Sequence, residues 1–110
     1  MNRIILIVML FMAGIASAEA EELVGSGTVN MILNYEAHSG PLIILSNMQS
    51  TIGSCQRNDY YMLPLNHKYF SQNYALILSA KMAGKSLQIV VDRSDCIEGM
   101  PRVKHVLIEN

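Results

Sequence analysis

The spacing of apolar residues between positions 71 and 91 predicts a helix that leads directly into a strand. Apolar residues recur at helical spacing and form one widened stripe, made of Tyr74, Ala75, Ile77, Leu78, Ala80 and Met82. We therefore expect a helix over residues 71–83, with Leu78 near the centre of its buried stripe. Ser71 is the expected N-cap, and Gly84 is expected in the left-handed conformation at the C-terminal end. Strand periodicity follows, with the alternating apolar residues Leu87, Ile89 and Val91.

Shorter strands are expected in four further segments: residues 28–35, 42–45, 60–65 and 102–108. The first has one wet face, because polar residues alternate with the apolar Val29, Met31, Leu33 and Tyr35. It forms a hairpin with the second across a turn that contains Ser, Gly and Pro. Pro64 confines the third strand to a sheet edge or to a strand end. In the last strand His105 is expected on the inner face, and residues 92–101 form a polar hairpin loop.

This order of elements predicts a single small β-rich α+β domain. One helix interrupts a set of short antiparallel strands that are joined by hairpin-length turns. The favoured architecture is an OB-like, partly open antiparallel β-barrel with one α-helix at about residues 71–83 and one disulfide. The alternative is an antiparallel sheet with one helix packed on one face.

The first residues of the chain have the three-part pattern of a secretory signal peptide. Arg3 precedes an uncharged apolar run of about 13 residues, and the small residues Ala16, Ser17 and Ala18 follow. A membrane anchor is the alternative, but this run is shorter than the ~20 residues that span a bilayer. We expect residues 1–18 to be a signal peptide cleaved after Ala18, or alternatively after Ala20, and residues 19–110 to form the domain. The protein is then exported through the inner membrane of a bacterium, into the periplasm or beyond.

Cys55 and Cys96 are the only cysteines of the sequence. An even number of cysteines in an exported protein predicts a disulfide, and small exported domains depend on such links. A redox or metal-binding pair is the alternative. The pair lacks the C-x-x-C spacing of redox sites, and two thiolates alone do not complete a zinc site. We therefore expect a structural disulfide that closes a loop of about 40 residues.

Charge and motif content argue against several function classes. The formal net charge is −1 and no basic run occurs, so nucleic-acid binding is not expected. The three histidines, His38, His67 and His105, lack the spacing of paired metal ligands. The acidic loop that contains Asp92, Asp95 and Glu98 lacks the ligand ladder of calcium loops. No set of nucleophile, acid and base is visible, so we expect no enzymatic activity, no metal and no cofactor.

Aromatic residues cluster before and within the expected helix: Tyr60, Tyr61, Tyr69, Phe70 and Tyr74. Such residues are common at sugar-binding and protein-binding surfaces. They also fill the cores of small domains, and we favour that role beneath the helix. The sequence therefore assigns no ligand-binding residue.

The segments Tyr74–Gly84, Lys85–Val91 and Arg102–Asn110, together with Cys96, resemble the C-terminal half of the B subunits of AB5-type bacterial toxins. The same segments are also similar to short exported bacterial proteins of unassigned role. The toxin resemblance implies a disulfide-bonded OB-fold that assembles as a homo-oligomer and binds cell-surface glycans. It transfers no binding residue, since the N-terminal half shows no matching motif and the chain has no tryptophan.

Two function classes follow from these observations. The first is a non-catalytic exported binding module, a glycan-binding OB-fold subunit of an oligomer. The alternative is a periplasmic or secreted protein–protein interaction domain that binds its partner through a sheet edge. Neither class requires stable membrane insertion after the signal peptide is cleaved.

Overall fold

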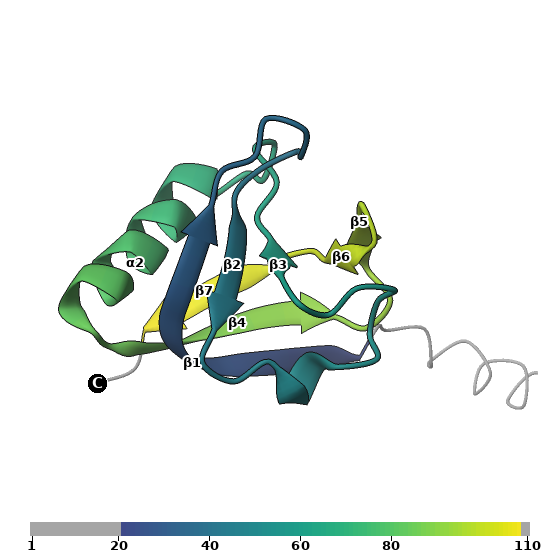
Figure 1. Cartoon of the computed structure of the whole chain (residues 1–110), viewed down its shortest axis with the longest axis horizontal. Helices are drawn as coiled ribbons and strands as arrows, with labels where there is room; N and C mark the ends of the chain where they lie inside the picture. The colour runs from purple at the N-terminus through teal and green to yellow at the C-terminus, as the bar shows by residue number, and fades with distance from the viewer. Residues whose placement is uncertain (1–20, 109–110) are drawn as a thin grey trace, which may run out of the picture.

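The computed structural model describes residues 21–108, so the predicted signal peptide and both candidate cleavage sites, after Ala18 and after Ala20, lie outside the described residues. The chain order in this part is β1 (Glu22–Leu33), β2 (Leu42–Leu45), the short 3-10 helix η1 (Gln49–Thr51), β3 (Tyr61–Met62), α2 (Phe70–Ala83), β4 (Ser86–Asp92), β5 (Cys96–Ile97), β6 (Met100–Pro101) and β7 (His105–Ile108) (Figure 1). None of the helices in residues 21–108 is both long and apolar enough to cross a membrane.

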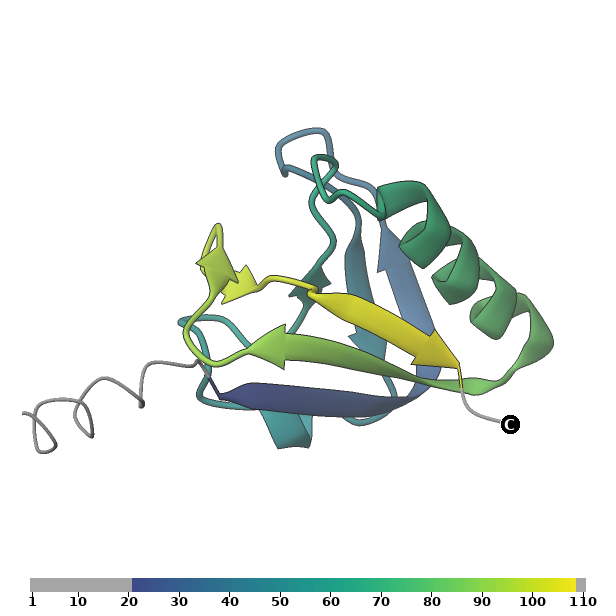
Figure 2. The same ribbon diagram turned by 180° about the vertical axis from the view of Figure 1, so that it is seen from behind.

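Five strands form one antiparallel sheet in the order β3-β2-β1-β4-β7, and β5 and β6 form a separate hairpin. The long strand β1 lies at the centre of this sheet. Its first part, residues 22–28, pairs with β4, and its last part, residues 29–33, pairs with β2. Figures 1 and 2 show that β1 bends strongly between these two parts, which curls the sheet around a single core.

The two edges of the curled sheet meet at one point. Met62 in β3 and Arg102, just before β7, form an isolated parallel bridge. The Val103 N–H also donates to the Met62 carbonyl at 2.9 Å. No continuous ladder joins β3 to β7 in the described residues, so the sheet is not closed into a barrel. The prediction of a small β-rich domain with antiparallel strands, one helix and one disulfide is confirmed at this level.

Side chains from every strand of the main sheet and from α2 fill the core enclosed by this curl. The fully buried members of this cluster are Ile43, Leu45, Tyr61, Leu63, Ile77, Ala80, Leu87, Ile89, Val91 and Val103. A second, smaller cluster of Leu42, Met62 and Met100 lies beneath the β5–β6 hairpin. The hairpin is therefore packed against the body of the domain through Met100.

The predicted helix is present, but its buried face differs from the prediction. The buried residues are Asn73, Ile77 and Ala80. Leu78 is 40% exposed and Met82 is 87% exposed, so the prediction that Leu78 lies at the centre of the buried stripe is wrong. Apolar residues occur all around this helix, and in that case packing rather than periodicity selects the face that meets the sheet.

The predicted ends of the helix are also only partly correct. Helix α2 begins at Phe70 after an N-cap at Tyr69, and no side chain caps it. Ser71 therefore lies inside the first turn and is not the N-cap. At the other end Gly84 is left-handed with φ 66°, as predicted. The Lys85 N–H donates to the Ala80 carbonyl at 3.0 Å, which completes the expected C-terminal motif.

Two strands depart from simple alternation. A bulge between Val29 and Met31 shifts the register of β1, so Val29 is buried whereas Met31 is exposed. The bulged strand changes which side chains face the core beyond that point. The chain before β7 is irregular, so Val103 and Val106 are both buried although they are three residues apart. His105 is exposed, and the prediction that it lies on the inner face is wrong.

Candidate ligand-binding site

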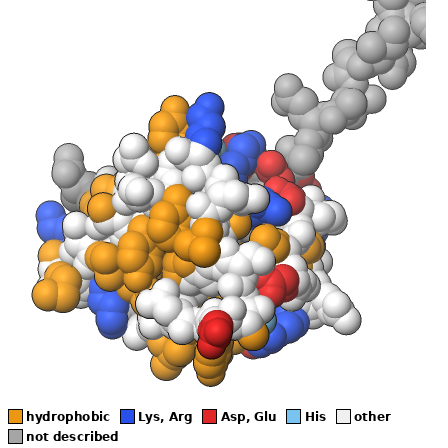
Figure 3. All heavy atoms as spheres, turned by 90° about the horizontal axis from the view of Figure 1, so that it is seen from above, with side chains coloured by type: hydrophobic (Ala, Val, Ile, Leu, Met, Phe, Trp, Pro, Cys, Tyr) orange, Lys and Arg blue, Asp and Glu red, His pale blue; other side chains and the backbone are white. Residues whose placement is uncertain are grey.

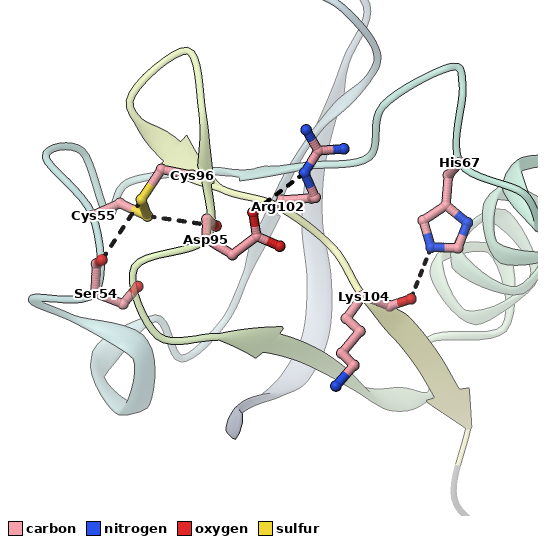
Figure 4. Close-up of polar contacts among 7 residues, drawn as sticks. All are labelled: Ser54, Cys55, His67, Asp95, Cys96, Arg102 and Lys104. Atoms are coloured by element: carbon pink, nitrogen blue, oxygen red, sulfur yellow. Dashed lines mark hydrogen bonds and ion pairs between the residues drawn. A yellow bond between two sulfur atoms is a disulfide. The ribbon is translucent and has the colours of Figure 1, made fainter. Parts of the chain in front are cut away.

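The predicted disulfide joins Cys55 and Cys96, whose Cα atoms are 5.9 Å apart. It links the loop after η1 to the start of the β5–β6 hairpin (Figure 4). At the base of the same hairpin, the Arg102 N–H donates to the Asp95 carbonyl at 3.1 Å. The Arg102 guanidinium also lies 3.5 Å from the Asp95 carboxylate. The hairpin is therefore held at its base by a covalent link and by an ion pair.

A tight turn at the tip of this hairpin directs a carboxylate toward the loop between β1 and β2. Ile97 pairs with Met100, so the turn contains only Glu98 and Gly99. Both have positive φ, at 53° and 81°. Two left-handed residues in a two-residue loop form a type I′ turn, which matches the twist of the flanking strands. Glu98 thus occupies a left-handed position that few residues other than Gly, Asn and Asp adopt.

The Glu98 carboxylate fastens the β1–β2 loop. His38 Nδ1 donates to one oxygen at 2.8 Å, and the Ser39 N–H donates to the other at 2.7 Å. These hydrogen bonds, that of His38 first, lower the pKa of Glu98 to about 2. The ring of His38 also lies edge-on to that of Tyr35, with ring centroids 5.9 Å apart. Glu98 therefore fixes the position and the orientation of His38.

A second set of contacts fastens the same loop to the segment after β3. The Leu63 N–H donates to the Pro41 carbonyl at 3.1 Å, and the Leu65 N–H donates to the Ser39 carbonyl at 2.9 Å. Gly40 lies so close to this segment that a methyl group in its place would overlap the Leu63 carbonyl. The loop is therefore held from two sides, by Glu98 and by residues 63–65.

These contacts shape an open pocket of about 410 Å³, which we call the loop-end pocket. Its apolar walls are Tyr35, Pro41 and Leu65, and its polar rim is Asn34, Glu36 and His38. Figure 3 looks down on this end of the molecule and shows a larger patch of hydrophobic side chains near its centre, with smaller groups around it. Tyr35 is 56% exposed, so a ligand can reach its side chain.

Most of the aromatic residues have the core role that we favoured. Tyr61 is fully buried, and its hydroxyl shares a hydrogen bond of 2.7 Å with Thr51. Burial raises the pKa of Tyr61. Phe70 and Tyr74 stack with ring centroids 5.6 Å apart and pack against the core. Tyr69 differs from these residues, because it is 52% exposed.

The three histidines have three different environments. His38 faces the pocket and Glu98, whereas His105 is exposed. His67 Nε2 donates to the Lys104 carbonyl at 2.8 Å, and its Nδ1 accepts from the Tyr69 N–H at 2.9 Å (Figure 4). His67 thus connects the start of α2 to the start of β7. In the part of the chain that the structure describes, no three His, Cys, Asp or Glu side chains form a metal-ligand group.

The sequence pattern does not predict the loop-end pocket. It places Tyr35 in a strand, and it offers His38 and Glu98 only as candidate metal ligands. His38 and Glu98 are 60 positions apart in the chain, and no local pattern shows that they meet. The one local signal is the presence of Tyr, Glu and His in one short turn.

The comparisons with known proteins do not extend this description. No protein-family model matches the chain, and no curated protein sequence matches it significantly.

Proposed function

We propose that this protein is an exported, non-catalytic binding module that recognises a glycan in the loop-end pocket. The observation that carries the proposal is the composition of this pocket: an exposed tyrosine ring beside polar groups, of which His38 is held in place by Glu98. An aromatic ring offers an apolar face with a polar tip, and polar groups around an apolar wall fix the orientation of a ligand. Tyr35 provides that ring, and Asn34, Glu36 and His38 provide the hydrogen-bonding groups.

The proposed architecture is an OB-like, partly open barrel. The strand order β3-β2-β1-β4-β7 and the position of α2 between β3 and β4 support it. The single parallel bridge between Met62 and Arg102, where the two sheet edges meet, supports it further. The OB-fold is a five-stranded, partly open barrel whose loops bind oligosaccharides or oligonucleotides. The resemblance to AB5-type toxin B subunits adds the proposal that the module acts as a subunit of a homo-oligomer.

Export is the third part of the proposal. The Cys55–Cys96 disulfide fits an oxidising compartment, since disulfides persist outside the reducing cytosol. The signal-peptide pattern of residues 1–18 points to the same route. The destination is the periplasm or the extracellular medium.

A glycan array with the oxidised protein beginning at Glu19 tests the binding function. We expect binding to a restricted group of glycans and its loss in Tyr35→Ala. Tyr69→Ala is the matched control, because Tyr69 is exposed to a similar extent but does not line the pocket. Equal loss in both variants, or no glycan bound by the parent protein, would contradict the proposal. Light scattering of the same samples reports the oligomeric state.

A protein–protein interaction domain is the second candidate. Exposed apolar side chains on α2 and β1 favour it, namely Leu78, Met82 and Met31. The contact of Lys81 Nζ with the Asn30 carbonyl at 3.3 Å shows that this part of α2 lies close to β1. A protein that binds no glycan, but loses its assembly in Met82→Lys, would favour this candidate over the first.

A further inference from the structure

We infer that the loop-end pocket selects uncharged saccharides and discriminates against glycans that end in a carboxylate or a sulfate. The inference rests on the proposed function and names the ligand class of the same site. It follows from the charges that line the pocket, from the backbone N–H groups that are already engaged there, and from the hydrogen-bonding capacity of the groups that remain.

No Lys or Arg side chain of residues 21–108 belongs to the walls or rim of the pocket. Most of these cations are held elsewhere by ion pairs, namely Arg57, Arg93, Arg102 and Lys104. Lys68 is the basic residue nearest in sequence to Leu65, and its ammonium lies over the Tyr69 ring, 5.2 Å from the ring centroid. An anionic sugar would therefore meet no Lys or Arg side chain in the pocket wall.

One carboxylate, Glu36, lines the pocket, and a second, Glu98, is hydrogen-bonded to the rim residue His38. Glu36 is an exposed residue of its rim, and within the described residues it forms no ion pair. Glu98 lies behind His38 and is ionised at neutral pH, since its pKa is about 2. A carboxylate or sulfate on a ligand at the rim would be repelled by Glu36, because like charges close together are unfavourable even near a solvated surface.

Two backbone donors of the β1–β2 loop are already engaged. The Ser39 N–H donates to Glu98, and the His38 N–H donates to the Tyr35 carbonyl at 3.2 Å. Anion sites in loops are commonly built from such free N–H groups. The β1–β2 loop gives these two donors to its own carboxylate and carbonyl, so they are not available to a ligand.

The groups that remain are suited to sugar hydroxyls. Glu98 accepts the hydrogen bond of His38 Nδ1, so Nε2 is the ring nitrogen that remains for a ligand. Glu36 is a hydrogen-bond acceptor, and sugar hydroxyls can donate to it. The ring of Tyr35 covers the apolar face of a sugar. The pocket thus combines hydrogen-bonding groups with an aromatic wall, which fits a polyhydroxylated uncharged ligand.

Paired glycans provide the test. Each uncharged oligosaccharide on an array is printed beside the same oligosaccharide carrying a terminal sialic acid or a sulfate. We expect the uncharged member of each bound pair to give a signal at least about fivefold higher, which is the effect of one repulsive charge pair about 4 Å apart in bulk water. Tyr35→Ala should abolish the signal from both members.

A charge reversal at the rim separates this inference from the proposed function. Glu36→Lys should reduce or reverse the preference, and Glu21→Lys, which changes the same charge before the distant start of β1, should leave it unchanged. Tyr35-dependent binding that prefers the sialylated or sulfated members would overturn the inference and leave the glycan function in place. A preference unchanged by Glu36→Lys would also overturn it. If the protein binds neither member of any pair, both the inference and the proposed glycan function are overturned.

Discussion

The buried face of α2 can be tested by comparing two adjacent residues. Ile77 is fully buried and belongs to the main core cluster, whereas Leu78 is 40% exposed. Ile77→Ala removes buried methyl and methylene groups and leaves a cavity, which costs about 2–5 kcal/mol. We expect a loss of about 3 kcal/mol in the free energy of unfolding, because the surrounding strands limit collapse of the cavity.

The same truncation at Leu78 should have a smaller effect. Full burial of a leucine side chain contributes about 1.5–3 kcal/mol, and Leu78 keeps a large part of its surface in water. No closed cavity forms at an open position, and alanine has the higher helix propensity. We therefore expect Leu78→Ala to lower the free energy of unfolding by about 1 kcal/mol.

Urea unfolding of the two variants and of the parent protein gives these differences, from transition midpoints at equal slope. The measurement should be repeated at two protein concentrations, because a loss that comes from weakened assembly depends on concentration and a loss from the core does not. A larger loss at Leu78 than at Ile77, independent of concentration, would refute the assigned face of α2. A loss at Leu78 that appears only at low concentration would instead place this residue in an oligomer interface.

Three further predictions concern the disulfide, the core and the cleavage of the signal peptide. Replacing both Cys55 and Cys96 by serine should lower the stability by about 4 kcal/mol in a urea melt, as chain entropy predicts for a loop of this length, and free thiols in the native parent protein would contradict the link. Tyr61→Phe should cost about 1 kcal/mol by the same assay, because the buried Thr51 hydroxyl loses its shorter hydrogen bond and keeps only that to the Met48 carbonyl, and an unchanged midpoint would refute this. The intact mass of the exported protein should correspond to a chain that begins at Glu19, and retention of the full chain in a membrane fraction would exclude cleavage.

Elements with strong local patterns were predictable from the sequence. The apolar run at Leu42–Leu45 and the alternation at residues 86–91 both form strands, and Pro64 follows a strand that lies at the sheet edge as expected. The disulfide was predictable because the chain offers only one pairing. In each case the signal lies within a few neighbouring residues or follows from the number of cysteines in the chain.

The remaining features depend on contacts between distant segments. The bulge near Val29 lies where β1 changes its pairing from β4 to β2. The alternation of residues within β1 gives no sign of this change. The buried face of α2 depends on the sheet beneath it, since the helix is apolar on several sides. The site depends most strongly on such contacts. Glu98 was visible only as part of a polar turn, and the type I′ geometry of that turn is what directs it toward His38.

The contribution of Glu98 should appear as a pH dependence of stability. Folding lowers the pKa of this carboxyl from 4.5 to about 2, through the hydrogen bonds from His38 and Ser39. A group with a depressed pKa in the folded state stabilises the protein above its unfolded pKa, and this contribution disappears as the pH falls through the folded pKa. The parent protein should therefore be more stable than Glu98→Gln above pH 4.5, and the difference should shrink progressively toward pH 2. Other carboxylates titrate in both proteins, so they cancel from this difference. A difference between the two melts that stays constant across this range, or grows toward low pH, would show that Glu98 does not fasten the β1–β2 loop.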